Sequence, residues 1–225
     1  MKICDRWIKV LGSLLVLGIT GQGFSEEAVS IKQGTEIATK GGDWFTRVRA
    51  LYVYPNYSSG SVNTIPDSAV GVKPSWTGEF DFGYMITKNL GTELILGTTC
   101  NTVFGRKALS GTKIGTAWLL PPTLTVQWRF LPTHRVQPYI GAGVNYTLFY
   151  GESCSLINTH MSLKHSWGPA AQFGADLFVS KHWFLNLDLK YIWMKTTAYL
   201  DGEVPGTVHV TVNPLLIGAG FGYKW

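Results

Sequence analysis

Apolar and polar residues alternate from Trp44 to the C-terminus of the 225-residue chain. Alternation with a period of two residues is typical of β-strands whose two faces meet different surroundings. A helix is a poor alternative, because the last segment contains Pro214 and then glycines at alternate positions. The pattern predicts an all-β fold. The eight expected strands are Trp44–Tyr54, Thr77–Ile86, Gly91–Thr99, Pro122–Phe130, Gln137–Phe149, Trp167–Val179, Trp183–Thr196 and Val208–Trp225.

The two faces of these strands differ in bulk as well as in polarity. One face is apolar, rich in large aromatic residues and free of charge, whereas the other holds charged residues and many glycines. A soluble barrel such as a lipocalin would turn its apolar face inward, into a narrow interior. Here the small residues accompany the charges, and small residues suit a crowded inner wall. We therefore expect an eight-stranded antiparallel transmembrane β-barrel with its apolar face towards lipid, where a charge costs roughly 2–4 kcal/mol.

The connections between the expected strands alternate in length. The long ones are 56–76, 101–119, 151–165 and 198–207, and the short ones are 87–90, 131–136 and 180–182. Transmembrane barrels have long extracellular loops and short periplasmic turns. An even number of strands then places both ends of the chain in the periplasm.

The N-terminus has the pattern of an export signal. Lys2, Arg6 and Lys9 precede or flank the uncharged stretch 10–20, which is too short to span a bilayer. We expect a signal peptide over 1–25 with cleavage after Ser25, a periplasmic linker over 26–43 and an outer-membrane barrel over 44–225. A retained anchor helix is the less favoured alternative. This export predicts localisation in the outer membrane of a Gram-negative bacterium.

Export to an oxidising compartment leaves two cysteines that could pair. Cys100 and Cys154 are the only cysteines after residue 25. A disulfide between them is possible in that compartment, but two cysteines define no framework, and two free thiols are the alternative.

Strand direction assigns a depth to each inward residue. Charged side chains gather towards the periplasmic end, where they can pair with one another, since an unpaired buried charge is costly. Apolar side chains gather towards the outer end and could admit a small hydrophobic molecule. The expected charge network is Arg47, Arg49, Glu79, Asp81, Glu93, Arg129, Asp176, Asp188, Lys190 and Lys224. The expected ligand or channel residues are Leu51, Val53, Ile95, Phe149, Ile192, Met194 and Leu216.

Other functions find little support in the sequence. The formal charge of +5 is scattered, without the Lys/Arg run of a nucleic-acid footprint. His160 and His165 lie near serines in one expected loop, but no Gly-x-Ser-x-Gly element occurs and no third spaced ligand is present. We therefore expect no enzyme activity, no metal and no cofactor.

Several stretches of the chain resemble the outer membrane protein W (OmpW) family of Gram-negative bacteria. They are Leu120–Leu124 (LPPTL), Gln137–Thr147 (QPYIGAGVNYT), Leu163–Gly168 (LKHSWG), Trp183–Leu187 (WFLNL) with Tyr191, Thr196–Ala198 (TTA) and Gly220–Trp225 (GFGYKW). Each is weak alone, but together they span the chain from about residue 44 to its end.

The resemblance implies an eight-stranded outer-membrane barrel with a narrow, partly apolar channel for small hydrophobic molecules. It also implies that Trp225, in phase with Tyr223 and Phe221, belongs to a signal that the outer-membrane assembly machinery reads. Lys190 departs from the expectation, since an apolar residue would suit a hydrophobic channel at that depth. It could pair with Asp188 or Glu79, or favour an anionic head group.

These observations predict a barrel that binds and passes small hydrophobic molecules through an apolar outer mouth above a charged periplasmic plug. Apolar residues that merely fill the barrel remain an alternative. A further alternative is a non-conducting structural barrel whose loops act as receptor or adhesion sites, for example for a phage or a bacteriocin. The expected partners are outer-membrane lipid and lipopolysaccharide, the assembly machinery and the small solutes themselves, but no nucleic acid.

Overall fold

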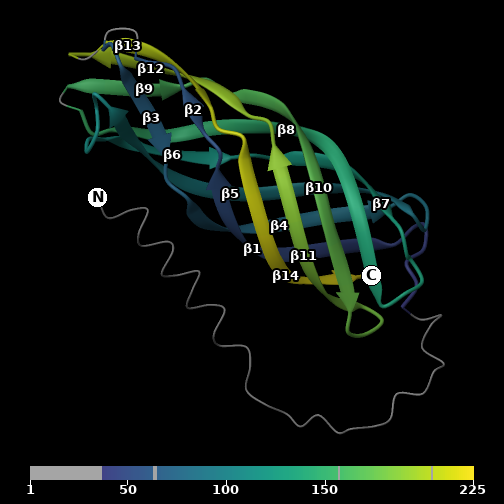
Figure 1. The fold of residues 1–225 in the computed structure, drawn as a ribbon. Coiled ribbons are helices and arrows are strands. Elements are labelled where there is room, and N and C mark those ends of the chain that lie inside the picture. Colours follow the sequence, from purple (N-terminus) through teal and green to yellow (C-terminus); the bar gives the residue numbers. More distant parts are fainter. Residues whose placement is uncertain (1–36, 63–64, 157, 204) are drawn as a thin grey trace, which may run out of the picture.

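The computed structural model of the protein describes residues 37–62, 65–156, 158–203 and 205–225 (Figure 1). The signal peptide and the first part of the expected linker lie outside these residues. Among the described residues, no helix has the length and hydropathy of a membrane span. The strands are β1 (Trp44–Pro55), β2 (Ser58–Ser59), β3 (Ser68–Val72), β4 (Ser75–Met85), β5 (Leu90–Lys107), β6 (Lys113–Leu120), β7 (Thr123–Arg129), β8 (Val136–Cys154), β9 (Thr159–Leu163), β10 (Ser166–Phe178), β11 (Trp183–Ile192), β12 (Lys195–Gly202), β13 (Gly206–Thr211) and β14 (Pro214–Lys224).

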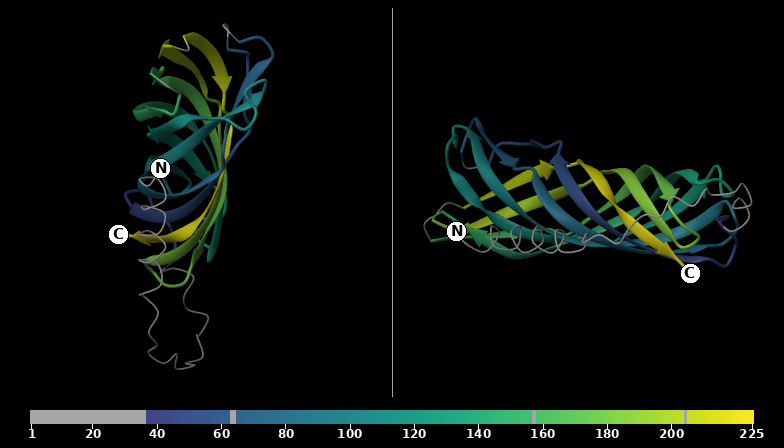
Figure 2. Two further views of the ribbon diagram at one scale, coloured as in Figure 1. Left: turned by 90° about the vertical axis from the view of Figure 1, so that its left-hand side faces the viewer. Right: turned by 90° about the horizontal axis from the view of Figure 1, so that it is seen from below.

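Eight of these strands close into a ring. Its order is β1, β4, β5, β7, β8, β10, β11 and β14, and β14 pairs with β1 to complete it. Every pairing is antiparallel, and the strands run inclined around an elongated tube (Figure 2). Closure leaves no unpaired edge, which lipid could not satisfy by hydrogen bonding. The predicted eight-stranded antiparallel barrel is confirmed.

The outer part of the barrel contains more strand than the sequence predicts. β5 continues to Lys107, and β6 returns from Lys113 into the expected loop 101–119. β3 pairs with this extension of β5, while β2, β13, β12 and β9 form a four-stranded sheet at the same end. Most of these residues were expected to be loops, although 208–211 of β13 lie in an expected strand. β5 and β8 extend outward from the membrane ring, and the additional strands pair with these extensions or with one another.

Two expected strands are interrupted at one level of the wall. The segment 208–225 breaks at Asn213, which has a φ of 34°, and resumes at Pro214. The segment 183–196 ends at Ile192 as β11 and resumes as β12. The side chain of Asn213 accepts the backbone N–H of Met194 at 2.9 Å, so the two breaks support each other. Proline cannot donate to a ladder, and asparagine tolerates positive φ, which explains the location.

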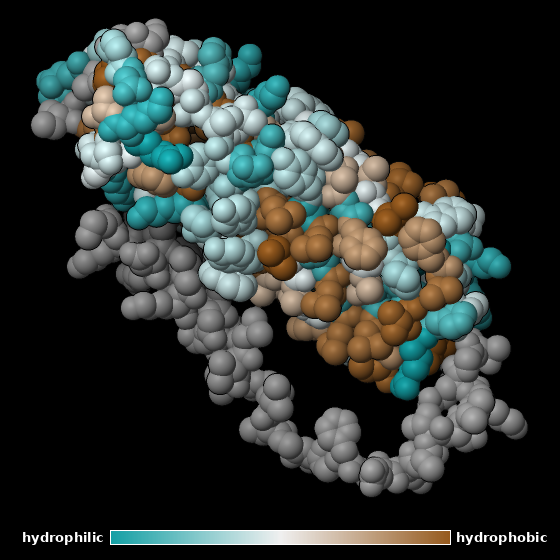
Figure 3. Space-filling model, viewed as in Figure 1, coloured by the Kyte–Doolittle hydropathy of each residue, from teal (hydrophilic) through white to brown (hydrophobic). Residues whose placement is uncertain are grey.

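The burial pattern confirms which face is outside. Phe82, Leu187 and Ile217 are 44%, 66% and 46% exposed, whereas Arg47 and Arg49 are fully buried inside the tube. Figure 3 shows the apolar residues as a brown band over one end of the molecule, with hydrophilic residues over the other. A closed tube of this kind presents to its surroundings a surface that only lipid solvates well.

Aromatic residues mark the two borders of the apolar band. Trp183 begins β11 and packs against Tyr223 of β14, which in turn contacts Trp225 just after that strand, and Trp193 follows the end of β11. Ten residues of tilted strand separate the two tryptophans, which corresponds to about 25 Å along the barrel axis. This height matches the apolar band of outer-membrane barrels, so these tryptophans lie at the two membrane interfaces.

Candidate functional site: the layered lumen

The lumen begins at the periplasmic end with a small apolar layer. Ile37, Phe45, Met85, Phe178 and Phe184 are buried there as one cluster. Gly83 makes room for the Phe45 ring, because a Cβ at that position would overlap it. We expected charged side chains nearest to the periplasm. This is wrong for the layer closest to the periplasm, which is apolar. Each phenylalanine of this layer stands alone at a strand end, so the sequence did not predict that Phe45, Phe178 and Phe184 would meet across the tube.

The end of the expected linker packs into this opening. The Thr39 hydroxyl donates to Gln137 Oε1 at 2.7 Å, and its N–H donates to the Pro132 carbonyl at 2.7 Å. The Lys224 ammonium donates to the Ala38 carbonyl at 2.7 Å. Residues 37–39 therefore pack into the periplasmic mouth and close it.

Arg47 is the first centre of the charged layer above. Its guanidinium pairs with Glu93 and, at 2.8 Å, with Asp176. Arg129 shares the same Asp176 carboxylate at 2.6 Å. Gln172 donates to Glu93 at 3.0 Å and Gln127 donates to it as well, so Glu93 is held from β1, β7 and β10. These bonds join β1, β5, β7 and β10 across the axis and block it.

Arg49 is the second centre, one inward position higher. It pairs with Asp81 at 2.6 Å, with Glu79 at 2.8 Å and with Asp188 at 3.4 Å. The hydroxyl of Tyr139 donates to Asp188 at 2.8 Å. Tyr139 was not among the expected site residues. The predicted pairing of the charged residues is confirmed for this layer.

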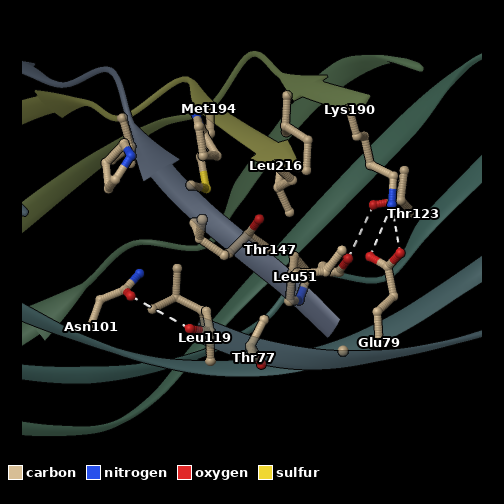
Figure 4. A pocket seen from close by; sticks show the side chains of 18 of the residues that line it. Leu51, Thr77, Glu79, Asn101, Leu119, Thr123, Thr147, Lys190, Met194 and Leu216 are labelled. Carbon is tan, nitrogen blue, oxygen red and sulfur yellow. Dashed lines mark hydrogen bonds and ion pairs between the residues drawn. The ribbon is translucent and has the colours of Figure 1, made fainter. Parts of the chain in front are cut away.

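Lys190 and Lys224 occupy different positions from the rest of the network. Lys190 binds both oxygens of Glu79, at 3.0 and 2.9 Å, which confirms one of its two expected partners. This pair faces the outer lumen (Figure 4). Lys224 lies below the network and pairs with Asp43 at 3.5 Å, so its expected place among the other lumen charges is wrong. Its position at the end of β14 puts it level with the periplasmic turns.

The outer lumen is an apolar chamber. Six of the seven expected ligand residues join one buried apolar cluster, whereas Ile95 is buried at mid-depth apart from it. The cluster also contains residues that the sequence analysis missed, most of which lie in segments expected to be loops. Those in the expected loops are Val62, Val70, Ile114, Ala117, Leu119, Met161, Ala198 and Leu200, whereas Ala170, Val208, Val210 and Val212 lie on expected strands but were not named as site residues.

Two adjacent cavities remain inside this chamber. The outer one has a volume of about 60 Å³ and the inner one about 40 Å³, and Asn101, Leu119 and Val212 line both. Figure 4 shows apolar side chains such as Leu51, Leu119, Met194 and Leu216 around the inner cavity, with the Lys190–Glu79 pair at one side of it. A small apolar molecule could enlarge them through rotation of flexible side chains such as Met194.

Cys154 has a free thiol in this structure, so the possible disulfide with Cys100 is not formed. Cys100 is opposite Trp118 of β6, whereas Cys154 is opposite Gly115 of the same strand. β6 therefore separates the two cysteines by two strand spacings, about 9–10 Å, and they are also offset by three residues along that strand. Cysteines bridge only when their Cα atoms lie within about 7 Å.

The expected assembly signal lies on the outer wall of β14. Phe221 and Trp225 are exposed, and the N–H of Trp225 donates to the Trp44 carbonyl at 2.9 Å. Tyr223 packs edge-on against Trp183 at 5.0 Å. These contacts fit an anchor at the periplasmic interface, and a role in assembly stays a prediction. Among the described residues, no group of three His, Cys, Asp or Glu side chains could hold a metal ion.

Comparison with known proteins identifies the family. The model of the OmpW family matches residues 40–225. The chain belongs to the OmpW family. It is 31% identical to outer membrane protein W of Escherichia coli over 205 residues, which are 87% of this chain and 94% of that protein. It is 40% identical to an uncharacterized outer-membrane protein of Sinorhizobium fredii, over 81% of this chain and 80% of the relative.

Solved structures agree with this assignment. The crystal structure of OprG from Pseudomonas aeruginosa is similar with a TM-score of 0.79 and 29% identity, over 84% of this chain and 98% of OprG. The solution structure of the E. coli outer membrane protein W has a TM-score of 0.56 and 29% identity, over 83% of this chain and 99% of that protein. This OmpW-family protein is therefore a barrel of the bacterial outer membrane, as its sequence predicts.

Proposed function

We propose that this OmpW-family barrel binds small hydrophobic molecules in its outer lumen and passes them into the membrane. The single observation that carries the proposal is the contrast along the axis: a buried apolar chamber with residual cavities stands directly above a plug of ion pairs. Apolar burial favours entry into the chamber by roughly 25 cal/mol per Å². Crossing the plug would instead require several buried ion pairs to separate.

The comparisons support an apolar solute. Two relatives from Pseudomonas, 36% identical over 149 residues, are named dibenzothiophene metabolism operon proteins. The match covers 65% of this chain and 70% of each relative. Dibenzothiophene is a flat aromatic molecule without charge, and a molecule of that class suits a chamber lined by Val, Leu, Ile and Met.

A lateral exit follows from an interruption of the wall. β5 pairs with β7 up to Ile95, opposite Thr123, and pairs with β6 only from Thr99, opposite Leu119. Thr98, whose side chain points outward, and Pro121 line the inner cavity at this break. We infer that solute leaves the chamber here towards the lipid, because the plug closes the axial route.

Uptake of dibenzothiophene by cells that display the protein in their outer membrane tests the proposal. Leu200→Asp places a charge in the chamber, and Tyr199→Asp places the same charge on the outer face of the same strand. We expect uptake to fall at least tenfold for Leu200→Asp and to stay unchanged for Tyr199→Asp. A mobility shift of the folded barrel on unheated gels controls for folding. Equal uptake by both folded variants would contradict the proposal and favour a structural barrel with receptor loops. No catalytic step is part of the proposal.

A further inference from the structure

A groove opens on the outside of the barrel where β10 and β12 diverge. The ladder between β10 and β11 ends with a bond from the Trp193 N–H to the Pro169 carbonyl at 3.0 Å. Further out, the backbone on the two sides is hydrogen-bonded again where the Lys164 N–H donates to the Thr197 carbonyl, also at 3.0 Å. Between these two bonds lies a groove of about 410 Å³, lined by residues from β10, β12 and β13.

The groove is positively charged. Lys164 and Lys195 line it, together with the imidazoles of His165 and His209. Of the described residues that line it, none is acidic. Both lysines are exposed, and neither belongs to an ion pair within the described part of the chain. Two ammonium groups that share one groove repel each other, and an anion between them relieves this repulsion.

Neutral donors accompany these charges. Ser166 also lines the groove and is 4% exposed, and its buried hydroxyl makes no hydrogen bond to any described residue. His165 Nδ1 accepts the Phe149 N–H at 3.2 Å, which leaves Nε2 to carry the proton in the neutral ring. A phosphate has several acceptor oxygens, so it could use cations and neutral donors together.

An aromatic surface borders the groove on its membrane side. A second hollow of about 420 Å³ adjoins it through Trp167 and Lys195, and Trp193 also lines that hollow. Trp167 is 70% exposed and Trp193 is 45% exposed. Because Trp193 marks the outer border of the apolar band, the lysines stand at the level of the outer-leaflet head groups. Figure 3 shows apolar residues giving way to hydrophilic ones in this direction.

We propose that this groove binds the phosphorylated head group of an anionic glycolipid of the outer leaflet. The lysines hold the phosphate, while Trp167 and Trp193 pack against the sugar and the upper acyl chains. Free phosphate would satisfy the charges but would leave the adjoining tryptophans unused. The glycolipid satisfies both, and charge complementarity together with this membrane depth selects it as the occupant.

Native mass spectrometry of the detergent-solubilised protein tests this site. The probe is bis-phosphorylated lipid A, and the double variant Lys164→Gln/Lys195→Gln is compared with the matched variant Lys88→Gln/Lys181→Gln on the periplasmic turns. We expect the groove variant to lose at least tenfold in affinity and the turn variant to bind as the unmodified protein does. Both variants change only exposed side chains, so both should fold.

Two further probes distinguish the source of the phosphate. Dephosphorylated lipid A should bind at least tenfold more weakly than the phosphorylated form, and inorganic phosphate should not displace the glycolipid at equal concentration. Equal affinity of the two lipids, displacement by inorganic phosphate, or full affinity in the groove variant would each overturn the proposal. Uptake of dibenzothiophene is a separate measurement, so failure of this site leaves the chamber proposal untouched.

Discussion

The outer and the periplasmic halves of the lumen are enclosed by the same closed barrel but hold opposite chemistry. In the outer half, Leu51, Met194 and Leu216 contribute to an apolar cluster that retains cavities. In the periplasmic half, Arg47 and Arg49 bind carboxylates across the axis. Both halves are walled by antiparallel β-strands. The inward side chains therefore decide whether a given depth of the lumen admits apolar molecules or is sealed.

The two halves differ in how the stability of each inward side chain depends on the side chains around it. A charged side chain in the plug is satisfied only by partners on other strands, so removal of one member leaves the others buried and unpaired. An apolar side chain in the chamber has many weak and interchangeable contacts. We therefore expect the plug to be sensitive to single substitutions and the chamber to tolerate changes of shape.

The largest effect should come from Arg49→Met. This change leaves Glu79, Asp81 and Asp188 without their shared cation, and we expect a loss of about 3–5 kcal/mol in the free energy of unfolding. Urea unfolding of the protein in lipid vesicles, followed by tryptophan fluorescence, measures it. Arg135→Met, on an exposed turn, is the control and should change stability by less than about 0.5 kcal/mol. Similar losses in the two variants would remove the distinction between plug and surface.

Leu51→Ala should produce the next effect. It truncates a buried side chain of the chamber, and we expect a loss of about 2–3 kcal/mol from lost burial and the enlarged cavity. The same unfolding experiment applies. This variant should retain uptake of dibenzothiophene, because the chamber stays apolar and becomes wider. Lost uptake in a folded Leu51→Ala protein would argue that the chamber requires a fixed shape.

Lys190→Met tests the boundary between the two halves. Glu79 keeps its pairing with Arg49 at 2.8 Å, so we expect a loss of only about 1–2 kcal/mol, clearly below that of Arg49→Met. The apolar chamber should also become deeper, with uptake at least as fast as in the unmodified protein. Lys190→Arg, which keeps the charge, is the comparison. A stability loss as large as that of Arg49→Met would place Lys190 within the plug.

Thr39→Val should give the smallest effect. It removes the hydrogen bond to Gln137 at the periplasmic mouth while keeping the shape of the side chain, and we expect a loss of about 0.5–1.5 kcal/mol. Uptake should not change, because the mouth lies below the plug. Ionic conductance in planar bilayers checks the closure: conductance that rises in Thr39→Val alone would show that the N-terminal segment, and not the plug, seals the axis.

Much of this architecture could be predicted from the chain alone. The alternation from Trp44 onward, with charge excluded from one face, identified the ring strands and their lipid-facing side. Strand direction also placed Arg47 and Arg49 towards one end and Met194 towards the other. These predictions succeed because period and polarity are local properties of a strand. The outer strands β3, β6 and β9 and most of β12 were missed, because their polar outer faces meet water and give no lipid signal.

The sequence by itself determined that this chain closes into a membrane barrel, since an uncharged apolar face beside a charged face has no other stable arrangement. The tertiary structure decided which residues meet across the tube: that Glu79 binds both Arg49 and Lys190, that β6 keeps Cys154 apart from Cys100, and that Ile37 and three phenylalanines close the periplasmic mouth. Register and barrel closure bring these residues together from distant strands. No local pattern encodes such distances, because they depend on how far each strand is shifted against its neighbours.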